Sequence, residues 1–225
     1  MTRMFIALYL LAQTLAAQAQ NAPARLGELA AAADLVGVAQ VIDTDYQYTR
    51  SFPSGGTAFL RMLIPYKVTQ PYDALVQVYE EGLHEHECYF PNPPVTEEGR
   101  RYLVFLRVNP DRPGQYLGLP GGCALEMLVT TDNEYALRYP PSGIELADEL
   151  LPLVKPLHFS DAHAVPDNEQ LAVDERNELL SGGWLKHLDD GRFAYTHGIP
   201  VAEVRDLLGA DNLTLERHLL QPRED

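Results

Sequence analysis

The sequence predicts a mainly β protein: a small closed barrel, or alternatively a β-sandwich, followed by an α-rich C-terminal extension. Apolar and polar residues alternate over residues 58–68, which is the period of a strand with one buried face. Residues 35–42 and 102–108 are almost wholly apolar, as expected for strands covered on both faces. Strand patterns follow one another from residue 35 to 139 with no helical pattern between them, which favours a barrel or a sandwich.

Further strands are predicted around these. Residues 74–78 repeat the alternation in a shorter strand, and residues 125–130 and 134–139 form an expected hairpin around Asp132-Asn133. Because Pro65 has no N–H to donate to a ladder, an edge segment or a bulge is expected at that point of its strand.

Beyond Pro140-Pro141 the pattern becomes helical. One helix, capped by Asp167, is predicted to run to about Leu180, and another is predicted over residues 201–208, with a short hairpin around Asp190-Gly191 between them. Helical turns are also predicted over residues 144–151 and from Thr214 to Pro222. The helix over residues 201–208 has an apolar stripe that is expected to cover the outer faces of the central strands. The stripe consists of Val201, Val204, Leu207 and Leu208.

The first residues predict an export signal. Arg3 precedes an apolar run over residues 4–15 that is too short to span a bilayer, and Ala17-Gln18-Ala19 matches the small-x-small pattern of signal peptidase sites. The mature protein is therefore expected in the periplasm or secreted, without a membrane anchor. The expected organisation is a signal peptide (1–19), a lead-in (20–32), a barrel domain (33–141) and an α-rich extension with a short hairpin (142–225).

Cys88 and Cys123 are the two cysteines of the chain. In an oxidising compartment an isolated pair most simply forms one disulfide. The alternative is a pair of free thiols that act as ligands or nucleophiles.

The formal net charge of the chain is −15 at pH 7. Such a surface repels phosphate backbones and anionic lipid headgroups, so nucleic acid and membrane surfaces are not expected as partners. The acidity either serves solubility through self-repulsion or attracts a basic partner or divalent cations.

Two stretches resemble the netrin/TIMP-like OB-fold domains. Residues 33–41, which read ADLVGVAQV, resemble their first strand, and residues 99–106, which read GRRYLVFL, resemble a later one. Cys123 follows Gly121-Gly122 where such domains often have a cysteine. The resemblance covers about residues 33–130 and implies an OB-like barrel. Inhibitors of that family begin with a cysteine that chelates a protease zinc, whereas this mature chain begins near Gln20. The resemblance therefore implies no zinc chelation, and it transfers no functional residue.

One cluster offers potential metal ligands. On a strand, His84, His86 and Cys88 would project from one face, and two imidazoles at that spacing can share a transition metal. A polar edge or loop beside a disulfide explains the same residues without a metal. We find no catalytic or cofactor signature: the nucleophile elbow, the H-E-x-x-H motif, the phosphate loop and the dinucleotide fingerprint are missing from the sequence.

Three aromatic residues, Tyr46, Tyr48 and Phe52, gather after the first predicted strand. OB-type barrels commonly bind ligands on one sheet face and its adjoining loops. These residues therefore form either a binding rim or an apolar plug at the end of the barrel.

Together these observations predict an exported, non-enzymatic binding or interaction module without a cofactor, whose partner is a protein or a small ligand outside the cytoplasm. The alternative is a periplasmic metal-binding protein or hydrolase that uses His84 and His86.

Removal of the signal peptide gives the first testable prediction. Signal peptidase is expected to cleave after Ala19 because the small-x-small triplet ends there. Intact-mass analysis of the exported protein should show the loss of residues 1–19. An exported protein that retains Met1 would contradict the predicted export route.

Overall fold

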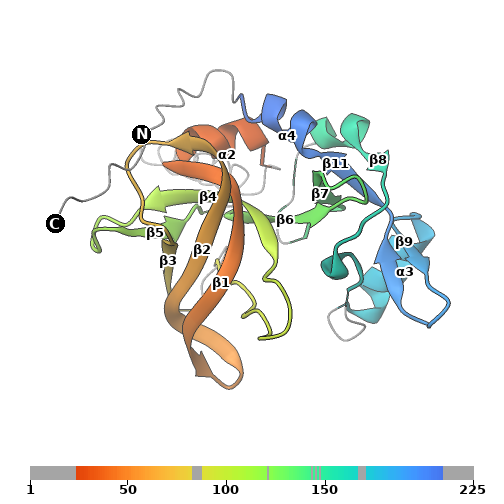
Figure 1. The fold of residues 1–225 in the computed structure, drawn as a ribbon, viewed down its shortest axis with the longest axis horizontal. Helices are drawn as coiled ribbons and strands as arrows, with labels where there is room; N and C mark the ends of the chain where they lie inside the picture. The colour runs from red at the N-terminus through yellow and green to blue at the C-terminus, as the bar shows by residue number, and fades with distance from the viewer. Residues whose placement is uncertain are drawn as a thin grey trace, which may run out of the picture.

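The computed structural model describes residues 24–82, 88–120, 122–142, 144, 146, 148–166 and 171–209. Its main feature is a closed barrel of five strands in the order β1-β2-β3-β5-β4, closed by pairing of β4 with β1 (Figure 1). Neighbouring strands are antiparallel except β3 and β5, which are parallel. The predicted OB-like barrel is thus confirmed in preference to a sandwich. Its strands are β1 (Leu35–Thr49), β2 (Phe52–Val68), β3 (Val76–Glu81), β4 (Arg101–Val108) and β5 (Gln115–Gly118).

Residues 35–39 of β1 and 103–106 of β4 are buried on both faces, as their apolar sequences predict. Leu35 and Val104 point into the barrel, whereas Val36 and Phe105 belong to a second cluster outside it. All four side chains have less than 1% of their surface exposed. These two strands therefore separate the interior of the barrel from an outer apolar core.

The bulge expected at Pro65 is present. Val36 pairs with Lys67 and Gly37 pairs with Pro65, so Tyr66 is the extra residue on β2. A second irregularity lies at Leu63, because Val38 pairs with Ile64 and Ala39 pairs with Met62. Ile64 and Tyr66 therefore pack in the outer core, although strict alternation places them with the residues inside the barrel. A side chain at Gly37 would collide with the Ile64 carbonyl at 2.5 Å, which explains the glycine there.

Strand β4 branches the sheet. One of its edges pairs with β1, and the other pairs with β6 up to Val104 and with β5 from Leu106 onward. Between them, the Phe105 N–H donates to the Cys123 carbonyl (2.8 Å) and the Phe105 carbonyl accepts from the Leu119 N–H (3.1 Å). The connection between β5 and β6 thus divides the sheet into the barrel wall and an extension.

The predicted disulfide is confirmed at this branch point. Cys88 and Cys123 are bonded, with a Cα–Cα distance of 6.0 Å and a sequence separation of 35 residues. Both cysteines are buried inside the barrel. A loop of that length corresponds to about 3–4 kcal/mol in the chain-entropy account. The bond ties the β3–β4 connection to the place where the sheet divides.

The extension continues from β4 in the order β6-β7-β11-β8. The expected hairpin around Asp132-Asn133 is formed by β6 (Ala124–Val129) and β7 (Tyr135–Tyr139). Strands β11 (His197–Pro200) and β8 (Lys155–Pro156) come from the C-terminal region. That region therefore completes the sheet of the barrel domain.

The C-terminal region is not the α-rich extension that the sequence predicts. It contains strands as well as short helices. Residues 197–200 form strand β11 because they pair with the edge of β7, which is distant in sequence. Helix α3 begins at Val173, and the expected cap Asp167 and the helical turns expected from Thr214 to Pro222 lie outside the described residues. The hairpin around Asp190-Gly191 is confirmed as β9 (Leu185–His187) and β10 (Phe193–Tyr195). The helical elements are η1 (Asp148–Leu153), η2 (Ala162–Ala164), α3 (Val173–Ser181) and α4 (Val201–Leu207).

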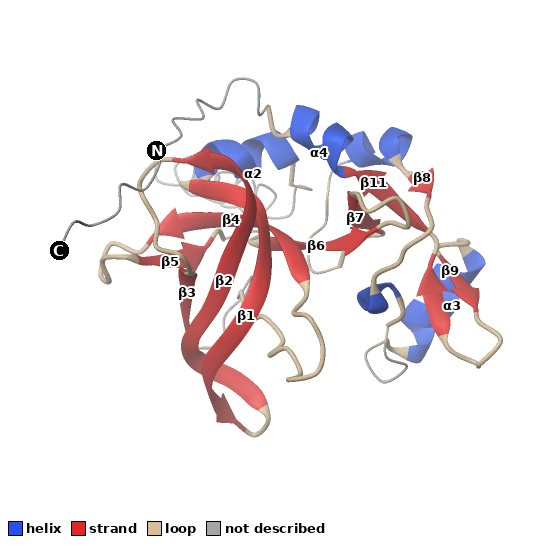
Figure 2. Ribbon diagram, viewed as in Figure 1, coloured by secondary structure: helices blue, strands red, loops and turns tan. Residues whose placement is uncertain are grey.

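Helices α2 (Leu26–Ala32) and α4 cover the outer apolar core on one side of the sheet (Figure 2). Val204 and Leu208 are buried there with Leu103 and Phe105, so the predicted covering stripe is confirmed. On the opposite face of β6, Leu128 packs with residues of α3, β9 and β10. We refer to α3, β9 and β10 as the C-terminal lobe.

Because the core is shared, the barrel and the C-terminal region should unfold together. Replacing the fully buried Ile199 of β11 by Ala should lower the free energy of unfolding by about 2–5 kcal/mol. Trp184 fluorescence, which reports on the lobe, and far-ultraviolet circular dichroism should give one common denaturant transition. Leu151→Ala, at a half-exposed site, is the control and should change stability by less than about 1 kcal/mol. Separate transitions for the two signals would refute a shared core.

Candidate functional site: the hairpin end of the barrel

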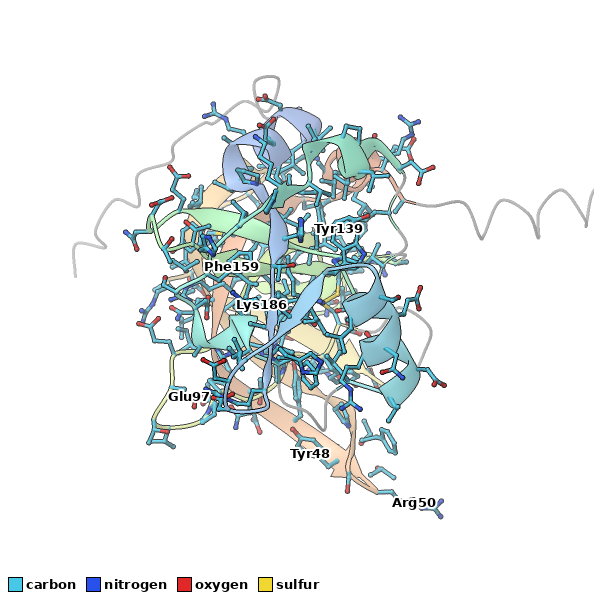
Figure 3. All side chains as sticks on the ribbon, turned by 90° about the vertical axis from the view of Figure 1, so that its right-hand side faces the viewer. Tyr48, Arg50, Glu97, Tyr139, Phe159 and Lys186 are labelled. Atoms are coloured by element: carbon cyan, nitrogen blue, oxygen red, sulfur yellow. A yellow bond between two sulfur atoms is a disulfide. The ribbon has the colours of Figure 1, made fainter. Side chains whose placement is uncertain are left out.

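The hairpin of β1 and β2 extends beyond the other barrel strands and forms a free end of the molecule (Figure 1). Its turn consists of Arg50 and Ser51, which both have positive φ angles (51° and 71°). Such a two-residue turn matches the twist of a β-ribbon. In a view turned by 90°, Tyr48 and Arg50 lie at the lower end of the molecule (Figure 3).

Two of the three predicted rim residues are exposed on this hairpin. Tyr48 is 59% exposed and Phe52 is 63% exposed. Few other large apolar side chains of the described residues are exposed to solvent to this extent. Aromatic side chains in such a position are typical of protein interfaces.

Tyr46 instead turns towards the barrel. Its hydroxyl accepts a hydrogen bond from the Phe90 N–H (3.1 Å), and its ring meets the Tyr89 ring edge-on at 5.0 Å. Burial raises the pKa of the Tyr46 phenol well above its usual value, so the hydroxyl stays neutral. Tyr46 thus anchors the β3–β4 connection, while Tyr48 and Phe52 face solvent.

Gly55-Gly56 lies within β2 rather than at the turn. Gly56 has φ +127°, and a side chain there would come within 2.1 Å of the Asp45 carbonyl. The glycines let β2 bend closely over β1 above the tip. The hairpin therefore owes its shape to local backbone requirements.

The second described part of the β3–β4 connection runs from Cys88 to Arg100 and is fixed to β1 near both of its ends. Phe90 bonds to Tyr46 as described, and the Val41 N–H donates to the Arg100 carbonyl (3.0 Å). Gly99 approaches so closely that a side chain would collide with the Val41 carbonyl. Between these ends, residues 91–98 turn away from the strand, and Val95 at their centre is fully exposed.

A cleft of about 480 Å³ separates this connection from the segment that leads to the C-terminal lobe. This size lies within the range of ligand-binding clefts. Prolines form much of its walls, and its polar groups come from both sides. The lining residues are Pro91, Asn92, Pro93, Pro94, Glu97, Glu98, Gly99, Arg100, Ala162, His163, Val165, Pro166 and Arg192.

A buried ionic network supports the wall of the cleft. Arg100 Nη1 lies 2.6 Å from Glu126 Oε1, and Arg138 Nε lies 2.7 Å from Glu126 Oε2. The Arg138 guanidinium also stacks over the Tyr195 ring at 4.5 Å. The network joins the end of the β3–β4 connection to β6, β7 and β10. Removing one partner of such a buried pair costs about 3–5 kcal/mol, so these residues hold the lobe in position.

The opposite wall is fixed by Asp161. Its carboxylate contacts the Arg101 guanidinium (3.3 Å) and accepts the N–H groups of Val129 (3.2 Å) and His163 (3.0 Å). His163 Nε2 in turn lies 2.9 Å from the Glu98 carbonyl across the cleft. Both walls are therefore held before any ligand arrives.

The described part of the chain contains no cluster that matches the predicted metal ligands. His84 and His86 lie outside the described residues, and among the described residues no group of three or more His, Cys, Asp or Glu side chains is placed to hold a metal ion. Cys88 is engaged in the disulfide. No helix within the described residues is long and apolar enough to cross a membrane.

The cleft and its ionic network were not predicted from the sequence. The only signal was that Glu126 and Arg138 interrupt otherwise apolar strand patterns. Buried charges are rarely placed in a strand without a partner. That signal does not identify the partner, because the strands that bring the charges together are paired only in the fold.

Comparisons of the chain with protein-family models, with curated proteins and with solved structures give no match.

Proposed function

We propose that this chain is an exported, non-enzymatic binding module of netrin/TIMP-like OB type, which holds a partner protein at the hairpin end of its barrel. The observation that carries the proposal is the exposure of Tyr48 and Phe52 on a projecting hairpin. Aromatic anchors on a rigid support lose little conformational entropy on binding, which favours affinity.

The surroundings of the hairpin support the same function. Tyr46, the disulfide and the Asp161 contacts fix the neighbouring connection and the cleft. A surface held in this way resembles preformed interfaces that change little on binding. The predicted signal peptide and the disulfide both agree with work outside the cytoplasm.

Loss of the two aromatic anchors tests the proposal. The mature protein is immobilised and exposed to envelope and extracellular extracts of its source organism, and retained proteins are identified by mass spectrometry. Tyr48→Ser/Phe52→Ser should reduce retention of the specific partner about thirtyfold, as expected when interface anchors are removed.

Leu151→Ser is the matched control, because Leu151 is also apolar and half-exposed but lies on η1. It should retain the partner at the wild-type level. Equal retention by the hairpin variant and the wild type would exclude this end of the barrel as the binding surface.

A further inference from the structure

One backbone edge at the hairpin end is open. On the side of β1 opposite β2, pairing with β4 ends at Gln40, and the Val41 N–H makes the last backbone bond. Within the described parts of the chain, no further backbone bond continues this edge over residues 42–49. This stretch is about 26 Å long at the usual rise of a strand.

Unpaired edges of this length readily accept another strand. The β3–β4 connection does not pair with this edge as a strand. Between Phe90 and Gly99 it makes no backbone hydrogen bond to β1 among the described residues. The hydrogen bonds that join this stretch to β1 involve side chains instead: the Phe90 N–H donates to the Tyr46 hydroxyl (3.1 Å), and the Gln40 side chain donates to the Gly99 carbonyl (3.3 Å). Among the described residues, no strand therefore pairs with β1 in line with β4 beyond Arg100.

We propose that the edge of β1 over residues 42–49 binds an extended, basic segment of the partner protein as an added antiparallel strand, in line with β4. This inference rests on the proposed binding function and names the chemistry of the partner. Backbone hydrogen bonds would supply affinity, and side chains of alternate residues would supply specificity.

The pattern of β1 defines the sequence that fits. From Asp43 to Gln47, exposed positions alternate with half-buried ones, and Tyr48 and Thr49 are both exposed. Asp43 and Asp45 face solvent on one face, whereas Tyr46 and Tyr48 lie on the other. Opposite charges on directly paired positions stabilise adjacent strands. The added strand should therefore alternate Lys or Arg with apolar residues.

The two aspartates also argue against a second copy of the chain as the occupant. Antiparallel pairing of two β1 edges would bring Asp43 and Asp45 of both copies together, and like charges across strands are destabilising. The net charge of −15 adds repulsion between copies. Asp43 Oδ1 accepts the neighbouring Thr44 N–H (2.8 Å), which orients the carboxylate without engaging a cation.

A synthetic peptide tests this directly. The probe is a capped peptide of alternating lysine and valine, with a capped glutamate–valine peptide as its charge-reversed control. Titration calorimetry at moderate salt should detect binding of the first and not the second. Asp43→Asn/Asp45→Asn should weaken binding about fivefold, the effect expected of two solvent-exposed ion pairs.

Two controls separate strand addition from general attraction. Asp73→Asn/Asp132→Asn removes the same charge at exposed positions outside β1 and should leave binding unchanged. A lysine–valine peptide with N-methylated alternate amides keeps its charge but cannot pair on that edge, so it should not bind. In the bound protein, amides of residues 42–49 should exchange more slowly.

Equal weakening by both aspartate pairs, or binding of the N-methylated peptide, would overturn strand addition. A stable dimer of the free protein in sedimentation would also overturn it, if Asp43→Asn/Asp45→Asn makes that dimer more stable. The edge would then bind a second copy of the chain. Failure of the peptide to bind while partner capture still depends on Tyr48 and Phe52 would refute this inference and leave the proposed function standing.

Discussion

The branching of the sheet at Phe105 is the constraint on which the rest of the structure depends. Its N–H and carbonyl bond to the two ends of the β5–β6 connection, so one strand serves both the barrel and the extension. The Cys88–Cys123 bond lies at the same point. Gly118 fits there because a side chain would collide with the Cβ atoms of both cysteines.

The β3–β4 connection links the branch point at Phe105 to the hairpin end of the barrel. From Cys88 the connection passes directly to Phe90, whose N–H bonds to Tyr46, and ends at Arg100 in the ionic network with Glu126. The hairpin, the cleft wall and the lobe are therefore fixed to one branch point. Such fixation lowers the entropy that a partner must overcome on binding. It also leaves the edge of β1 open, because the connection turns away from β4 at Gly99.

Much of the main sheet could be predicted from local pattern. The apolar stretch of β4, the bulge at Pro65 and the hairpin at Asp132-Asn133 all arise from residue properties that act within a few positions. The short strands β5 and β11 could not be found in this way. They are four residues long and depend on pairing with partners distant in sequence.

The candidate site shows the same limit. Tyr48 and Phe52 stand out in the sequence as aromatics after a strand, but the bond that turns Tyr46 inward comes from Phe90, more than forty residues later. The Arg100–Glu126–Arg138 network likewise joins residues of separate strands. In the C-terminal region the sequence His197-Gly198-Ile199-Pro200 carries no strand pattern, and it becomes a strand by pairing with β7 and β8.

Amide hydrogen exchange in Cys88→Ala/Cys123→Ala tests most directly whether the branch point organises the binding end. The account predicts faster exchange at Phe105 and Leu119, whose bonds form the branch, and at Phe90, which the disulfide holds near Tyr46. Among the described residues the strands of the β9–β10 hairpin pair with each other. Their amides should therefore lose protection only by the loss of global stability that denaturant unfolding of the variant shows, which is less than the loss at Phe90 and Phe105. Unchanged protection at Phe90 and Phe105 in this variant would contradict the account.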